Sequence, residues 1–120
     1  MGDKKLAPIE SRFADIIWKN EPLASKQLVI LAEETLGWKK TTTYTVLKRL
    51  CERGIFQNQN GTVTSLLTKA DLQGMQSEEF VNETFQGSLP AFLAAFGSRK
   101  KLSQKEISQI ERMIREMKEG

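Results

Sequence analysis

The segment from which the fold can be inferred is KKTTTYTVLKRLCERG, residues 39–54. At about 100° per residue, one side of this segment is apolar or small and the other side is polar. The first side carries Thr43, Val46, Leu47, Leu50 and Cys51. The opposite side carries Thr41, Thr42, Thr45, Lys48, Arg49 and Glu52. The pattern predicts a helix over residues 39–54 that packs one face on a core and exposes the other.

The same segment concentrates positive charge. It holds five Lys or Arg residues and one Glu, a surplus of four charges, whereas the whole chain carries +3. Short hydroxyl side chains let a helix lie close to base edges, and longer cationic side chains reach phosphates. This is the layout of a recognition helix in the major groove of DNA. The alternative is a surface helix whose hydroxyls and charges are only solvated, but the low helix propensity of Thr favours the DNA interpretation.

Two helices are predicted before this segment. The first begins at Pro8, where a missing amide hydrogen costs nothing, and closes at Trp18, before a break at Asn20-Glu21-Pro22. Its core-spaced residues are Ile9, Phe13, Ile16 and Ile17. The second begins near Ser25 as its cap and stops at Gly37. Its apolar positions are Leu28, Leu31, Ala32 and Leu36. The short connection to residue 39 predicts a helix-turn-helix.

A β-hairpin is predicted directly after the recognition helix. Residues 55–59 and 62–66 flank Asn60-Gly61, a dipeptide suited to the positive φ angles of a two-residue type I′ turn. The predicted fold class is therefore mainly α with a small β-hairpin, a winged helix-turn-helix head followed by a C-terminal helical region. An unrelated α+β domain with a solvent-exposed hairpin is the alternative.

The C-terminal region is predicted to be helical. Thr68 and Asp71 form a capping pattern, residues 89–96 form an apolar helix with almost no polar face, residues 97–101 form a basic linker, and Ser103 with Glu106 caps a last amphipathic helix. A terminal helix of this length is marginal alone, and a symmetric dimer would bury its apolar stripe. The alternative is that these helices fold back on the same chain. The predicted dimerisation residues are Leu89, Phe92, Leu93, Phe96, Ile107, Ile110, Met113, Ile114 and Met117.

Two domains follow from this reading. Residues 1–68 are predicted to form a winged-helix DNA-binding domain, and residues 69–120 a helical dimerisation domain. Residues 1–70 carry a net charge of +4 and residues 71–120 a net charge of −1, so we expect only the front half to meet a polyanion.

Composition argues against catalysis and cofactors. The chain has no His and a single Cys51, so metal sites and the common nucleophile-plus-base arrangements lack their residues. Cys51 is expected to be a buried thiol. There is no apolar run of about 18 residues and no signal-peptide core at the N-terminus, whose residues 1–5 are expected to be disordered. We expect a cytoplasmic protein without enzymatic activity, cofactor, metal or membrane contact.

Several short motifs, taken in order, resemble those of one family. They are Ile16-Ile17-Trp18 with Pro22-Leu23, Trp38, residues 42–50 with Gly54, Gly87-Ser88-Leu89, Phe96, and Leu102-Ser103 with Glu106. Together they resemble the penicillinase-repressor family of winged-helix transcriptional repressors, which includes β-lactamase, methicillin-resistance and copper-transport-operon repressors. The resemblance covers nearly the whole chain.

The resemblance implies a homodimer whose C-terminal helices interlock while two heads bind a palindromic operator in double-stranded DNA, upstream of resistance genes. It also implies a sensor-linked protease as a candidate partner. The positions that match the DNA-facing helix of the family are Lys40, Thr41, Thr42, Tyr44, Thr45, Lys48 and Arg49. We expect the three threonines to approach bases and Tyr44 and Lys48 to hold the DNA backbone. Arg49 either contacts phosphate or pairs within the fold.

The chain departs from the family pattern in several places, one of which is a shorter segment between the wing and Gly87. The wing, residues 58–62, lacks the basic residue that family wings often place beside the turn. Ala95-Phe96 stands where the β-lactam-responsive repressors have a cleaved Asn-Phe pair. The C-terminus has no cysteine cluster of the copper-responsive kind. A winged helix used for protein–protein contacts, without sequence-specific DNA binding, is the alternative function.

Overall fold

The computed structural model describes residues 5–119. The expectation for the N-terminus therefore lies, for residues 1–4, outside the described residues. The elements are α1 (Pro8–Asn20), β1 (Leu23–Ala24), α2 (Ser25–Leu36), α3 (Lys40–Glu52), β2 (Phe56–Gln59), β3 (Thr62–Ser65), α4 (Lys69–Phe85), α5 (Leu89–Arg99) and α6 (Gln104–Glu119). The mainly helical fold class with a small antiparallel sheet is confirmed.

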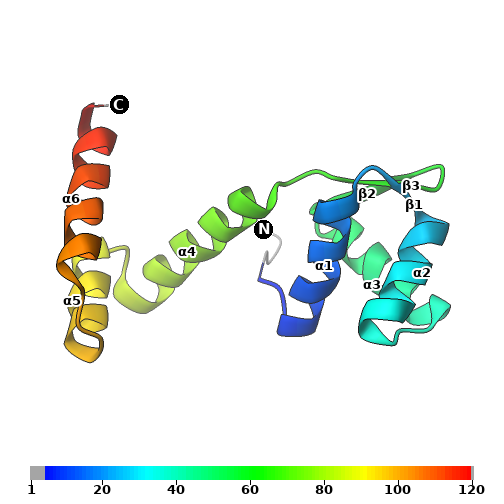
Figure 1. Ribbon diagram of the computed structural model, residues 1–120, viewed down its shortest axis with the longest axis horizontal. Coiled ribbons are helices and arrows are strands. Elements are labelled where there is room, and N and C mark those ends of the chain that lie inside the picture. The colour runs from blue at the N-terminus through cyan, green and yellow to red at the C-terminus, as the bar shows by residue number, and fades with distance from the viewer. Residues whose placement is uncertain (1–4, 120) are drawn as a thin grey trace. The chain divides into compact units, whose positions relative to one another are not determined.

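The chain divides into two compact units, Met1–Glu78 and Glu79–Gly120. In the first unit, α1, α2 and α3 lie beside one another, and the strands run across one end of these helices (Figure 1). The helix α4 begins in the first unit and ends in the second. The predicted boundary at residues 68 and 69, which separates two roles, stays a prediction.

The core of the first unit forms where α1, α2, α3 and the sheet meet. The ring of Phe13 packs 5.0 Å from that of Trp38, and Trp18 packs 5.3 Å from Phe56. The indole Nε1–H of Trp18 donates to the backbone oxygen of Leu67 at 3.0 Å, which satisfies its polar atom. The buried apolar residues are Phe13, Ala14, Ile16, Ile17, Leu23, Leu28, Ala32, Val46, Leu47, Leu50, Ile55, Phe56, Val63 and Leu72.

The first helix starts as predicted but is less buried at its start. Pro8 occupies its first turn, and the Glu10 carboxylate accepts the backbone N–H of Ala7 at 2.9 Å. Ile9 is 41% exposed, so its predicted core position is wrong. Periodicity places Ile9 on the correct side of α1, but the first turn of a helix can extend past the elements that cover its middle.

The helix-turn-helix has the predicted C-terminal stop but not the predicted cap. Gly37 ends α2 with φ +72°, in the left-handed region that favours glycine. Ser25 is the first residue of α2 rather than its cap, and Ala24 caps the helix without a side-chain hydrogen bond. Ser25 is instead buried, with 8% of its surface exposed. Its backbone N–H donates to the Gly61 oxygen at 2.8 Å.

The hairpin forms the predicted turn. Asn60 and Gly61 have φ angles of +54° and +85°, and Gln59 pairs with Thr62, as in a two-residue type I′ hairpin. A further strand, β1, pairs antiparallel with β3 and gives the sheet order β1-β3-β2. The sequence does not predict β1, because a strand of two residues is too short to show an alternating pattern.

In the second unit, α5 is longer than predicted. Ser88 caps it by accepting the Ala91 N–H at 3.1 Å, and the helix continues to Arg99. The prediction of a linker over residues 97–101 is therefore wrong for residues 97–99, which belong to α5. A single Gly97 costs a helix only about 1 kcal/mol, which does not stop it. The predicted box of Ser103 and Glu106 is confirmed, with Glu106 N–H donating to Ser103 Oγ at 3.1 Å.

Substitution of two glycines by alanine should change the stability of the protein in opposite directions. Gly61 has φ +85°, so Gly61→Ala should destabilise the first unit by about 1–3 kcal/mol. Gly74 lies inside α4 with no atom within 4 Å of an added Cβ, so Gly74→Ala should stabilise by about 0.5–1 kcal/mol. Urea unfolding can be followed by fluorescence of Trp18 and Trp38, both in the first unit. Equal effects of the same sign would contradict the assigned backbone roles.

Candidate nucleic-acid interface

The helix α3 presents one polar face and buries the other. Thr43, Val46, Leu47 and Leu50 are buried against the core, as the spacing predicts. Cys51 is only half-buried, so the expected burial is incomplete. Burial still raises the pKa of the Cys51 thiol, and the adjacent Glu52 adds to this, so the thiol stays protonated at neutral pH. The helix is thus held by its apolar side and leaves the polar side available.

The residues predicted to face DNA all lie on α3, and most are exposed. Only Tyr44 is half-buried. The Thr45 hydroxyl donates to the Thr41 backbone oxygen at 2.8 Å within the helix. Its hydrogen is therefore used, and Thr45 offers a ligand an acceptor oxygen and a methyl group, which suit a base amine and a thymine methyl. The exposed members of the set are Lys40, Thr41, Thr42, Thr45, Lys48 and Arg49.

Tyr44 joins three elements of the first unit. Its hydroxyl donates to Ser25 Oγ at 3.2 Å, and the Ser25 backbone N–H donates to the Gly61 oxygen at 2.8 Å. This series links α3 to the start of α2 and to the tip of the hairpin. A phosphate accepts hydrogen bonds only, so the predicted backbone contact of Tyr44 requires its O–H to turn away from Ser25.

Arg49 pairs within the protein, one of the two roles that the sequence left open. Its Nη1 lies 3.1 Å from Glu10 Oε2, and Arg53 Nη1 lies 3.7 Å from Glu10 Oε1. The backbone N–H of Ala7 is the main cause that holds the pKa of Glu10 below its usual value, and both arginines act in the same direction, against partial burial. The carboxylate is thus charged at neutral pH and connects the start of α1 to α3.

The hairpin contributes no positive charge to this surface. The sequence has no Lys or Arg between Arg53 and Lys69, and the exposed residues at the hairpin tip are uncharged. They are Asn58, Gln59, Asn60 and Thr62. The exposed cations that α3 itself offers a polyanion are Lys40, Lys48 and Arg49.

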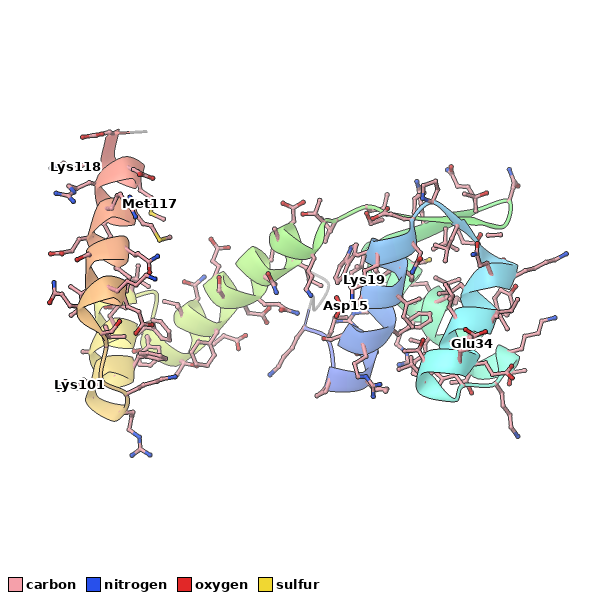
Figure 2. The ribbon with its side chains drawn as sticks, viewed as in Figure 1. Asp15, Lys19, Glu34, Lys101, Met117 and Lys118 are labelled. Carbon is pink, nitrogen blue, oxygen red and sulfur yellow. The ribbon has the colours of Figure 1, made fainter. Side chains whose placement is uncertain are left out.

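The predicted dimerisation residues lie on α5 and α6, neither of which has a buried residue. Phe92, Leu93 and Ile110 are half-buried, and the others are exposed. Met117, the most exposed at 72%, projects from α6 (Figure 2). The exposed members are Leu89, Phe96, Ile107, Met113, Ile114 and Met117.

A ring cluster in the second unit extends this apolar set. Phe92 lies 6.2 Å from Phe80, 5.8 Å from Phe85 and 6.1 Å from Phe96, measured between ring centroids. Phe80 is still half exposed. Phe80 and Phe85 lie on α4 and are not among the dimerisation residues that the sequence predicts. Edge-to-face packing of Phe92 supports a packing role for these rings.

The sequence does not indicate that Glu10 and Ser25 contact the α3 residues that are predicted to face DNA. Glu10 shows the local signal of a first-turn acid, which explains its bond to Ala7 but not its contact with Arg49, 39 residues away. Ser25 was expected to be a helix cap. No pattern in the sequence could have found either tertiary contact.

Within residues 5–119, no group of three His, Cys, Asp or Glu side chains could hold a metal ion. None of the helices in that range is long and apolar enough to cross a membrane.

The chain is similar to known repressors along nearly all of its length. A family model described as penicillinase repressor matches residues 6–116. A penicillinase repressor of Bacillus licheniformis is 24% identical over 118 residues, which cover 95% of this chain and 92% of that protein.

The lowered pKa of Glu10 predicts a pH-dependent contribution to stability. A carboxyl with a lowered pKa stabilises the fold above its ordinary value of 4.5, and this is lost as pH falls through the folded pKa. Glu10→Gln should therefore cost about 1 kcal/mol at pH 7, as for a solvent-screened hydrogen bond to a charged group, and less at about pH 3. Urea unfolding at a fixed protein concentration measures this. A cost that is the same at both pH values would contradict the assignment.

Proposed function

Because the chain belongs to the penicillinase repressor family, we propose that it is a homodimeric transcriptional repressor that occupies a palindromic operator through α3, without catalysis of its own. The target genes that fit this proposal best are resistance or stress genes. Its place of action is the cytoplasm, where the DNA lies.

The observation that carries this proposal is the division of α3 into two faces. The apolar face is buried in the core, and the exposed face combines threonines with lysines. Thr41, Thr42 and Thr45 are short enough to let the helix backbone approach base edges in the major groove. Lys40 and Lys48 are long enough to reach phosphates on either side. The same helix thus supplies sequence reading and electrostatic attraction.

Dimerisation is supported by the apolar surface of the second unit. Ile114 is 52% exposed and Met113 is 53% exposed, on a terminal helix of 16 residues. An amphipathic helix of this length is marginal in water unless its apolar stripe is covered. A second copy of the same helix would cover it with a matching stripe, and a two-fold dimer matches a palindromic operator.

We also propose that a sensor-linked protease is a partner of this protein and inactivates it by cleavage. The bond between Ala95 and Phe96 lies inside α5, and the Ser98 hydroxyl donates to the Ala95 oxygen at 2.8 Å. Proteases bind extended backbone, so this part of α5 has to unfold locally before the bond is cut. Ala95 in place of a family Asn also implies a different cleavage specificity.

Operator binding can be tested with the DNA upstream of the reading frame of this protein. Removal of the two hydroxyls and methyl groups in Thr42→Ala/Thr45→Ala should weaken specific binding about tenfold or more, because base contacts are lost. Thr35→Ala, an exposed threonine on α2, is the matched control and should bind as the wild type does. Fluorescence anisotropy with labelled DNA measures the affinities.

The same titration at two salt concentrations separates the proposal from its alternative. Lys and Arg replace counterions on phosphates, so affinity should fall about tenfold or more over a few-fold rise in salt. Wild-type binding no tighter than to scrambled DNA, with no salt dependence, would reject the repressor proposal. The uncharged hairpin would then favour a winged helix that binds another protein.

The dimer can be tested through the apolar face of α6. Ile114→Glu should raise the dimer dissociation constant at least about a hundredfold, because it buries an unpaired charge in the proposed contact. Ser108→Glu, exposed on the opposite face of the same helix, is the matched control and should leave the dimer intact. Analytical ultracentrifugation gives both constants. A wild-type protein that stays monomeric at micromolar concentration would contradict this part of the proposal.

A further inference from the structure

We propose that Glu10 is a positioning residue for DNA binding, because it holds the guanidinium group of Arg49 in place for a phosphate contact beside the bases read by α3. This inference rests on the proposed function, since it assigns a role within the same interface. It concerns two residues on different helices, Glu10 on α1 and Arg49 on α3.

A positioning role requires a covered Glu10 side chain and an exposed Arg49 side chain, and the structure has both. Arg49 Nη1 lies 3.1 Å from Glu10 Oε2; the Arg49 side chain is 53% exposed and the Glu10 side chain 13%. The Glu10 side chain is therefore largely covered, while about half of the Arg49 side chain is open to a ligand. An arginine carries five N–H donors in a planar fork, so one bond to Glu10 leaves others for a phosphate.

Glu10 is itself fixed, so it can serve as a support. Its Oε1 accepts the backbone N–H of Ala7 at 2.9 Å and lies 3.7 Å from Arg53 Nη1. Arg53 also donates through Nη2 to the backbone oxygen of Lys5, which ties the residues before α1 to the end of α3. These contacts restrain the Glu10 carboxylate. Its bond to Arg49 therefore restrains the Arg49 side chain as well.

The position of Arg49 on α3 suits a contact near the bases. Arg49 follows Thr42 by seven residues, which is about two turns, so the two side chains lie on the same side of the helix. They are separated by about 10 Å along the helix axis. A helix with Thr42 at a base edge would therefore place Arg49 near the DNA backbone that borders the groove.

The proposal makes a prediction opposite to that of simple electrostatics. Removal of an acidic group near DNA normally strengthens binding, because the protein then repels the phosphates less. An arginine that is not held must instead be ordered when it binds, which costs affinity. If Glu10 positions Arg49, its loss weakens binding although the protein becomes more positive.

The experiment is a double-mutant cycle on operator affinity in the full-length dimer, with Glu10→Gln, Arg49→Ala and the double variant. Glutamine keeps the shape of Glu10 and can still accept the Ala7 N–H. Glu10→Gln should weaken operator binding at least about threefold. In the Arg49→Ala background the same change should not weaken binding, because no arginine remains to be positioned. Glu34→Gln, which removes an exposed acid of α2 (Figure 2), is the charge-matched control and should not weaken binding.

Each result of the cycle either supports or overturns the inference about Glu10. Glu10→Gln that binds as tightly as the wild type, or more tightly, overturns the inference and leaves the proposed function standing. A loss that is equally large in the Arg49→Ala background also overturns it, since Glu10 then acts on the fold alone. A wild-type protein that does not bind its operator overturns both. If Glu10→Gln does not fold, Glu10→Asp tests the same point, because it keeps the charge but withdraws the carboxylate from Arg49.

Discussion

The first unit depends on the burial of one face of α3. Thr43, Val46, Leu47 and Leu50 are buried where α3 packs against α2 and β2, and Thr43 satisfies its hydroxyl by donating to the Lys39 oxygen at 3.2 Å. This contact fixes the rotation of the helix about its axis. The threonines and lysines of the opposite face are exposed as a consequence, so the core packing and the proposed DNA contact are two sides of one constraint.

Long-range polar contacts then fix the elements around α3. Glu10 joins α1 to α3 through Arg49, and Tyr44 joins α3 to α2 through Ser25. At the base of the hairpin, the Glu21 carboxylate accepts both the backbone N–H and the hydroxyl of Ser65 at 2.8 Å. These bonds are directional, whereas apolar packing is not. They therefore help to set how the hairpin and α1 are placed beside α3.

The two units differ in how much of their apolar surface they bury. The first buries its large side chains, with Phe13, Ile17 and Phe56 at 0% exposure. In the second, α5 and α6 have no buried residue, and Met117 is 72% exposed. A small helical unit cannot cover its own apolar faces because its surface is large relative to its volume. This contrast supports a division between a head that folds on itself and a region that needs a partner.

The sequence by itself determined the features that rest on neighbouring residues. It predicted the faces of α3, the Asn60-Gly61 turn, and the capping box that Thr68 and Asp71 form, because helical period, turn geometry and capping involve residues only a few positions apart. The tertiary structure decided the rest. The strand β1 exists only because β3 lies beside it, and Arg49 contacts a carboxylate 39 residues earlier in the chain. Such contacts depend on how the elements pack in space, and no local pattern records them.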